Sequence, residues 1–599
     1  MKKLDFIKKS LPALFSVIFT LFPVFLSAKS VEAEKAVLVA QYFVEQKFDS
    51  KAQKEELSIV YIAKTAEYVV YYVFNVGETG FVIISGDDIA RPVLGYSTEG
   101  KYNPDDLPLN FMTWMADIYN FISAGIKSGC SNNREIEAEW KAFLNRESAY
   151  FSKTKNETAV NPLIKTTWNQ NDPYWNQSPF YQGNRCLTGC VATSMAQIMK
   201  YYNHPATGKG YSEPYTTETL GIYIPAVNLN ANYNFNNMGD AVPTTAAQQE
   251  NVARLMYHCG VTVKMNYKPT ESTAKQHNIA KAVTTHFGYD QSIRYELRTY
   301  YTDMQWIDLL KKELNTSRPI FYVGYNESGG GHAFVCDGYD NQNYFHFNWG
   351  WSGSHDGFFS VNPMPNQYYP NNNDIYCNFK PDAGGKKVYQ INIAYEDPGK
   401  DLTATKSVVN TLETFTASAR FYNTSPWDFV GTYSIGLFNT LGNLVEVIGN
   451  YSVSTTLPAW YWWTNPFTIN CKVSASVPAG NYTIRAITKA NDANEWVVAR
   501  GTGINELPLQ VKGGNSIVEN NQTTFSIIPN PTTGKLKIEN GELKIKNVEI
   551  FDVFGEKVFE QKENPILLRY YDITAFPAGA YFIRITTDNG AVIRKIIKK

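Results

Sequence analysis

The strongest constraint on this chain is a loop that runs directly into a helix at residues 183–200. The first half is rich in glycine and polar residues, and the second half spaces its apolar residues as a helix needs to bury one face. Cys190 lies at the junction. A cysteine there meets unsatisfied N–H groups and the positive end of the helix dipole, which favour thiolate over thiol. Since most cysteines are buried apolar residues or disulfide halves, a catalytic interpretation needs partner residues.

Candidate partners for a nucleophilic cysteine occur on both sides of it. His332 follows three glycines and precedes a short apolar run typical of a strand. The alternating residues 344–351 predict a second strand, which could pair with the first and bring Asn348 or Trp349 beside the imidazole. Gln170, in a turn-rich segment before the cysteine, is a candidate donor to an oxyanion. Cysteine catalysis needs such a set, although His332 alone could equally be a structural histidine.

Several short motifs occur in one order along the chain: residues 168–170 (WNQ), 188–193 (TGCVAT), 331–334 (GHAF), 348–351 (NWGW) and 356–359 (DGFF). From Pro162 to about Phe379 this order resembles the streptopain family, the papain-like cysteine peptidases of bacteria. The resemblance implies that Cys190 is the nucleophile, that His332 is the general acid and base, and that Gln170 stabilises the oxyanion.

The same resemblance implies further roles around the cleft. Either Asn348 or Trp349 would orient the histidine, because papain relatives use an asparagine and streptopain-like enzymes place a tryptophan near that position. Gly331 would line the substrate cleft, and Thr273 matches a family segment near the specificity pocket. Neither the residues nor the resemblance implies a cofactor or a metal.

The N-terminus predicts export. Residues 1–28 begin with several lysines, continue with an apolar run of moderate length and end in small residues. This order is typical of a removable signal peptide. Seven cysteines in 599 residues are too few and too scattered for a disulfide framework, and the close pair Cys186 and Cys190 has no second pair to complete a metal site. A formal net charge of −1 gives no reason to expect a nucleic-acid partner.

Residues 29–155 predict a small α+β domain. A helical segment is expected at about 33–48, strands at 58–62, 68–74 and 80–85, and a second helix at 111–126. Residues 80–88 and 93–97 resemble the streptopain propeptide. We therefore expect an inhibitory prodomain that blocks the cleft of a protease domain at residues 156–383.

The chain beyond the protease predicts two β-rich domains. Short alternating runs at 388–512 favour an immunoglobulin-like β-sandwich, for which adhesive, substrate-binding and spacer roles are all open and a spacer is favoured. Residues 523–599 resemble the C-terminal sorting domain of type IX secretion, which implies the outer-membrane secretion machinery as a partner and a secreted or cell-surface product.

The predicted fold class is therefore multidomain α+β: a small α+β prodomain, a papain-like protease domain and β-sandwich domains. The predicted function is a secreted cysteine endopeptidase made as a zymogen, which acts on proteins or peptides. Two alternatives are an acyl-transferring enzyme, such as a transglutaminase or amidase, and a surface adhesin with an inert protease domain.

Residues 147–162 form the predicted maturation region. The polar segment 152–157 has no apolar period and is typical of an exposed junction that proteases cut. N-terminal sequencing of the active enzyme should find its first residue within this region. A mature start elsewhere would contradict the assigned boundary.

Overall fold

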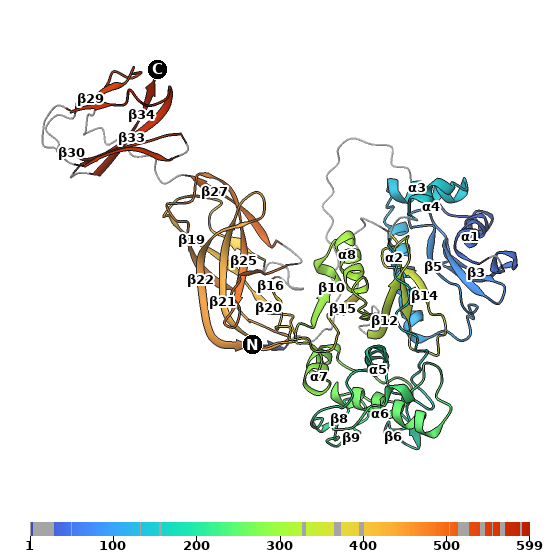
Figure 1. The fold of residues 1–599 in the computed structure, drawn as a ribbon. Coiled ribbons are helices and arrows are strands. Elements are labelled where there is room, and N and C mark those ends of the chain that lie inside the picture. The colour runs from blue at the N-terminus through green and yellow to red at the C-terminus, as the bar shows by residue number, and fades with distance from the viewer. Residues whose placement is uncertain are drawn as a thin grey trace.

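The computed structural model describes residues 2–3, 29–49, 51–131, 133–154, 158–325, 331–364, 373–393, 401–501, 504–512, 526–539, 545–553, 555–562, 569–587 and 590–599. Most of the predicted signal peptide, part of the maturation region and the linker at 513–525 lie outside these residues. Within them, no helix combines the length and apolarity needed to cross a membrane. The domains follow one another in chain order (Figure 1).

The N-terminal domain is a four-stranded sheet with helices on both faces. Its elements are α1 (Ala33–Lys47), η1 (Ala52–Lys54), β2 (Leu57–Lys64), β3 (Val69–Val76), β4 (Gly80–Ser85), β5 (Val93–Ser97), α2 (Leu109–Lys127), α3 (Arg134–Leu144) and α4 (Ser148–Thr154). Alternate residues of β4 point to opposite faces, so Phe81 and Ile83 pack with α2 while Val82 and Ile84 pack with α1. The expected helices and strands are confirmed, and α3 and α4 are additional.

The predicted protease domain, called the protease below, has a helical lobe and a sheet lobe. Its elements are β6 (Phe180–Tyr181), β7 (Asn184–Arg185), α5 (Cys190–Tyr202), β8 (Tyr215–Thr216), β9 (Tyr223–Ile224), η2 (Phe235–Asn237), α6 (Ala246–Thr262), η3 (Gln276–Asn278), α7 (Ile279–His286), β10 (Arg294–Leu297), η4 (Arg298–Tyr300), α8 (Asp303–Leu314), β11 (Ile320–Tyr325), β12 (Gly331–Tyr339), β13 (Tyr344–Asn348), β14 (Gly357–Ser360) and β15 (Asn373–Cys377). The expected pairing of two strands is confirmed: β12 pairs with β13, and Val335 lies opposite Asn348.

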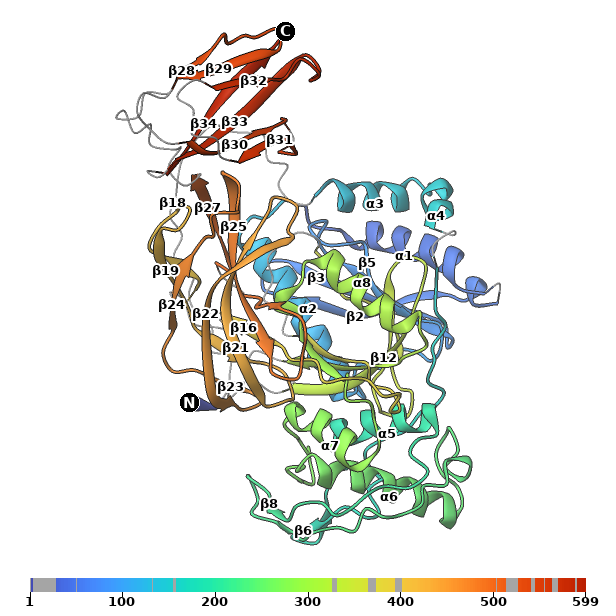
Figure 2. The same cartoon turned by 60° about the vertical axis from the view of Figure 1, so that its left-hand side comes forward.

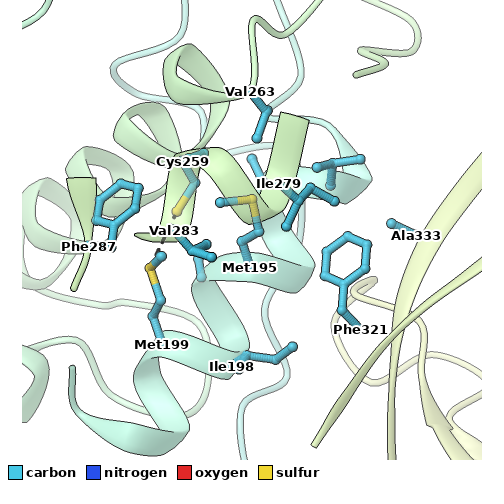
Figure 3. Close-up of a cluster of buried hydrophobic side chains, with 14 of the residues drawn as sticks. Met195, Ile198, Met199, Cys259, Val263, Ile279, Val283, Phe287, Phe321 and Ala333 are labelled. Carbon is cyan, nitrogen blue, oxygen red and sulfur yellow. Dashed lines mark hydrogen bonds between the residues drawn. The ribbon is translucent and has the colours of Figure 1, made fainter. Parts of the chain in front are cut away.

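An apolar core joins α5 to α6 and α7, and Figure 3 shows its sulfur-containing centre, where the Cys259 thiol lies 3.7 Å from the Met199 sulfur. Met195 and Ile198 lie on the buried side of the same helix, as the spacing predicted. The apolar face of α5 therefore anchors the helix that begins at Cys190.

The prodomain and the protease share one sheet. The strand order is β10-β15-β11-β12-β13-β14-β5-β4-β3-β2, so the protease strand β14 pairs directly with the prodomain strand β5. Gly95 allows this approach, because a Cβ atom there would lie 2.4 Å from the ring of Phe359. The prodomain is thus attached through backbone hydrogen bonds as well as side chains.

Two β-rich domains complete the chain. The sandwich contains β16 (Ile391–Ile393), β17 (Thr403–Ala404), β18 (Val408–Asn410), β19 (Thr414–Ala419), β20 (Phe421–Asn423), β21 (Phe429–Phe438), β22 (Leu444–Leu457), β23 (Tyr461–Trp462), β24 (Phe467–Lys472), β25 (Gly480–Ala490), β26 (Val497–Val498) and β27 (Glu506–Lys512); β1 (Lys2–Lys3) pairs with β23. The terminal domain contains β28 (Ser526–Ile528), β29 (Lys535–Glu539), β30 (Ile545–Phe551), β31 (Lys557–Lys562), β32 (Arg569–Asp572), β33 (Gly579–Thr587) and β34 (Gly590–Lys598). Figures 1 and 2 place it beyond the sandwich.

The sandwich packs against the protease. Trp460 is 3% exposed and belongs to the same apolar cluster as the protease core, with its ring 5.2 Å from that of Tyr295. Arg500 donates hydrogen bonds to Tyr301 and to the buried carboxylate of Glu296, at 2.7 and 3.0 Å. A simple spacer would need no such contacts, so the sandwich is a structural neighbour of the protease rather than a tether alone.

Replacing Trp460 by alanine should therefore destabilise the protease as well as the sandwich. Truncating a buried tryptophan costs about 3–5 kcal/mol, because apolar burial is lost and a cavity remains. Thermal unfolding followed by residual peptidase activity would measure the effect. Trp496→Ala is the matched control, since that half-buried ring lies over Lys489 of the sandwich itself. Equal unfolding temperatures for the two variants would contradict the docking role.

Candidate active site

Cys190 is the first residue of α5, and the residue before it must be glycine. Gly189 has φ of +87°, and a Cβ atom there would lie 2.7 Å from the Met265 sulfur and 2.8 Å from the Ser272 carbonyl oxygen. Both the backbone conformation and the close packing exclude a side chain. The loop-to-helix junction predicted at this position is therefore confirmed.

The predicted nucleophile and the predicted histidine segment meet. The N–H of Ala333, the residue after His332, donates a 3.4 Å hydrogen bond to the Cys190 sulfur. The His332 imidazole is buried, and its Nε2 atom lies 3.9 Å from a carboxylate oxygen of Glu271. Across the described residues, no hydrogen bond joins the His332 ring to the Cys190 thiol.

Burial dominates the electrostatics of this pair. Desolvation raises the pKa of the Cys190 thiol to about 11, and the negative charge of Glu271 adds to the rise, while N–H groups of Ala333 and Val191 oppose it. Desolvation also lowers the pKa of His332, although Glu271 acts in the opposite direction. Hence the neutral thiol and the neutral imidazole are favoured here. The thiolate expected from the helix N-terminus is outweighed by burial.

Gln170 lies beside the nucleophile loop. Its side chain is buried, and its backbone carbonyl accepts a 3.0 Å hydrogen bond from the N–H of Thr188, two residues before Cys190. Within the described part of the chain, its side-chain amide makes no hydrogen bond. The amide is therefore free to donate to an oxyanion, and that role stays a prediction.

Asn348 links the two lobes. Its Oδ1 atom accepts hydrogen bonds from Gln197 Nε2 on α5 and from the N–H of Gly350, both at 3.0 Å, and its Nδ2 atom donates to the Thr166 carbonyl oxygen at 2.8 Å. The Thr166 hydroxyl in turn donates to Gln197 at 2.8 Å. This closed network fixes α5 against β13.

Trp349 is fully buried, and its indole N–H donates to the His355 carbonyl oxygen at 2.7 Å. Its ring lies 4.7 Å from that of Phe334. Where the structure describes the chain, neither Asn348 nor Trp349 makes a hydrogen bond or ring contact with His332. The role of either residue in orienting the histidine stays a prediction.

The two predicted substrate-binding residues border the same region. Gly331 begins β12 opposite Tyr325, directly before His332. Thr273 pairs with Asn266 through backbone hydrogen bonds of 2.7 and 3.3 Å. The loop that Thr273 closes also carries Glu271, which is partly buried. Sequence reasoning missed it because a single glutamate has no distinctive pattern.

The prodomain contributes a second residue that sequence reasoning missed. Asn110, near the start of α2, is buried and donates hydrogen bonds to the carbonyl oxygens of Ala333 and Trp349, at 2.7 and 2.9 Å. Its neighbour Phe111 packs against the Trp349 ring at 5.8 Å. In the sequence, the one feature that could have indicated this contact was a polar residue on the apolar face of the predicted helix.

Other side chains strengthen this interface. Lys47 of the prodomain forms a 2.7 Å ion pair with Asp340 of the protease, and the hydroxyl of Tyr96 donates to the same carboxylate at 2.9 Å. His355 of the protease lies among prodomain aromatic rings, and its Nε2 atom accepts a hydrogen bond from the N–H of Asn103. The prodomain thus contacts both the strand next to His332 and the loop after Trp349.

All seven cysteines are free thiols. Among the described residues, no cluster of three or more histidine, cysteine, aspartate or glutamate side chains could hold a metal ion. The expected absence of a metal and of a cofactor stays a prediction.

A cysteine begins helix α5, the strand that carries His332 lies against it, and the N-terminal domain contacts that strand through Asn110. Comparison with known proteins agrees: residues 168–359 match the model of the peptidase C10 family, residues 28–122 match the Spi protease inhibitor, and residues 526–599 match a secretion system C-terminal sorting domain. Streptopain of Streptococcus pyogenes is 32% identical over 308 residues, which cover 49% of this chain and 74% of that protein. The chain belongs to the peptidase C10 family of streptopain-like cysteine peptidases.

A second curated relative and a solved structure also match part of the chain. The thiol protease/hemagglutinin PrtT of Porphyromonas gingivalis is 29% identical over 345 residues, covering 56% of this chain and 39% of that protein. The solved structure of a prointerpain A fragment from Prevotella intermedia is 29% identical, with a TM-score of 0.44, and covers 54% of this chain and 97% of the fragment. The two family matches and the observed sheets confirm the expected fold class, a prodomain followed by a papain-like domain and β-domains.

Asn110 offers a test of the prodomain contact. In Asn110→Ala two buried carbonyl oxygens lose their donor, which costs about 1–3 kcal/mol, or roughly a 5- to 150-fold weaker inhibition. The inhibition constant of separately produced prodomain against the mature enzyme would measure it. Met112→Ala, at an exposed position of the same helix, should leave inhibition unchanged. Equal inhibition by both variants would remove Asn110 from the inhibitory contact.

Proposed function

We propose that this cysteine peptidase is a secreted endopeptidase, made as a zymogen, that cleaves proteins or peptides through a thioester intermediate. The observation that carries this proposal is the hydrogen bond from the Ala333 N–H to the Cys190 sulfur. It brings the histidine strand against the start of α5, so that a nucleophile and a general acid lie in one place.

Exposure of the site to water would change the protonation states of Cys190 and His332. The pKa of Cys190 is raised chiefly by burial, and the pKa of His332 is lowered chiefly by burial. Admitting water would therefore lower the first value and raise the second. Both changes favour the thiolate and imidazolium pair, so any step of maturation that exposes these two side chains to water would promote activity.

The mechanism follows from this pair. The Cys190 thiolate attacks the substrate carbonyl carbon, and the side chain of Gln170 and the backbone N–H of Cys190 stabilise the oxyanion. His332 donates its proton to the leaving amine, which departs and leaves a thioester. His332 then removes a proton from water, whose attack releases the acid product and restores the thiol.

Export would use both ends of the chain. Residues 1–28 would direct the chain out of the cytoplasm, and the domain that matches a secretion system sorting domain would address it to an outer-membrane machinery. The product would be released or held at the cell surface. Its partners would be protein substrates, its own prodomain and the secretion machinery, with no nucleic acid.

Acyl transfer and adhesion are the competing functions. An acyl-transferring enzyme would use the same two residues, and incubation with casein and an amine donor separates cross-linking from hydrolysis. An adhesin with an inert protease domain would keep its effect after Cys190→Ala. Gln170 is buried, and its backbone is bonded to the loop before Cys190. Its presence there supports hydrolysis or transfer over adhesion, because an inert domain does not need an oxyanion donor.

The mechanism predicts distinct effects of two substitutions in the mature enzyme. Cys190→Ala should abolish casein hydrolysis, because the nucleophile is lost. Gln170→Ala should lower turnover by about two to three orders of magnitude while Cys190 still reacts with a thiol-directed epoxide, because only oxyanion stabilisation is lost. Asn171→Ala, the exposed neighbour, is the matched control. Near wild-type turnover of Gln170→Ala would remove Gln170 from the scheme.

A further inference from the structure

Glu271 lies on a loop that is attached to the segment before the nucleophile. The N–H of Leu187 donates a 3.1 Å hydrogen bond to the carbonyl oxygen of Lys268. A Cβ atom on Gly189 would lie 2.8 Å from the carbonyl oxygen of Ser272, so the backbones of the two segments are in contact. Glu271 is therefore one residue away from a point of contact with the nucleophile segment.

The backbone of this loop is held on both sides of Glu271. The N–H of Lys268 donates a 2.9 Å hydrogen bond to the Ser272 hydroxyl, which in turn donates to the Lys268 carbonyl oxygen at 3.1 Å. Asn266 and Thr273 pair through their backbones. The position of the Glu271 backbone is thus fixed, while its side chain can adapt to a ligand.

Glu271 differs from the other glutamates of the helical lobe in its lack of a cationic partner. Residues 166–290, which hold this lobe, contain four glutamates. Three of them form ion pairs: Glu213 with Lys264, Glu218 with Lys275 and Glu250 with Arg254. In the part of the chain that the structure describes, no lysine or arginine forms an ion pair with Glu271.

The carboxylate of Glu271 is partly removed from water. Its side chain is 40% exposed, and the His332 Nε2 atom lies 3.9 Å from its Oε1 atom, which is too far for a hydrogen bond. A carboxylate that has lost part of its hydration and has no cation beside it attracts a cation from solution. The open fraction of the side chain leaves room for one.

The charge of Glu271 is felt at the nucleophile. Burial is the main cause of the raised pKa of the Cys190 thiol, and the negative charge of Glu271 adds to it. Together with the contact between the two segments, this places the carboxylate near the atoms that react. A cation bound there would belong to a substrate residue near the scissile bond.

We propose that Glu271 is a specificity-determining residue of this peptidase, whose carboxylate binds the lysine or arginine side chain of a substrate residue near the scissile bond. The substrates that it favours are proteins and peptides with a basic residue at that position. This inference rests on the proposed function, because it names the substrate class of the same site.

Peptide cleavage by the mature enzyme tests the preference. The substrates are peptides that differ at one position beside the scissile bond, which carries lysine, methionine or glutamate. Glu271→Gln should lower kcat/KM about 3- to 10-fold for the best lysine peptide and leave the methionine peptide unchanged, because one partly exposed ion pair is lost. Glu271→Lys should make the glutamate peptide better than the lysine peptide.

Glu213→Gln is the matched control, since this exposed glutamate of the same lobe is already paired with Lys264. It should keep the preference of the wild type. An unchanged ratio of lysine to methionine cleavage in both Glu271 variants would overturn the proposal. An equal loss for all peptides would also overturn it, because Glu271 would then act on the reacting groups rather than on the substrate side chain.

A second measurement does not depend on peptidase activity. Two methanethiosulfonate reagents, one with a trimethylammonium and one with a sulfonate group, are reacted with Cys190 of the mature enzyme and followed by mass spectrometry of the labelled peptide. Glu271→Gln should lower the ratio of the cationic to the anionic rate by about threefold. A changed pKa of the thiol affects both rates equally and leaves the ratio unchanged.

The two measurements separate the two proposals. The same ratio of labelling rates in the wild type, Glu271→Gln and Glu213→Gln would overturn the role of Glu271, because its charge would not reach a ligand at Cys190. If the wild-type mature enzyme cleaved no peptide, the proposed function would fail. The labelling ratio would then still decide whether Glu271 attracts cations to the nucleophile.

Discussion

The contact between the start of α5 and strand β12 is the interaction on which the site depends. One hydrogen bond, from the Ala333 N–H to the Cys190 sulfur, joins the helical lobe to the sheet lobe at the point where chemistry would occur. A second hydrogen bond, between the buried side-chain amides of Gln197 and Asn348, joins the same two lobes. Because these amides bond to each other and to Thr166, a shift of either lobe would leave buried polar groups without partners.

The prodomain uses the same sheet that builds the site. By adding β5 to the edge strand β14, it gains backbone hydrogen bonds that depend little on side-chain identity, while Asn110 and Phe111 reach the residues around His332 and Trp349. The prodomain therefore contacts the backbone on both sides of the histidine strand, next to a cysteine and a histidine that are both buried.

Much of the fold followed from local patterns. The apolar spacing after Cys190 predicted α5, and the alternation around His332 and Asn348 predicted the pairing of β12 with β13, because a single buried face imposes a period on each element. Helices α3 and α4 were missed. Asn110 and Glu271 were missed for a different reason: each is one polar residue whose role comes from a neighbour distant in the chain.

By itself, the sequence determined that the chain is a multidomain α+β protein with a cysteine at a helix start, a histidine at a strand start and an N-terminal domain of its own. Only the tertiary structure decided how deeply that pair is buried and which charged residue lies near it. The pKa values of Cys190 and His332 depend on how much water each group loses and on the charge of Glu271. Burial and distance between remote segments are properties of packing, so no local pattern encodes them.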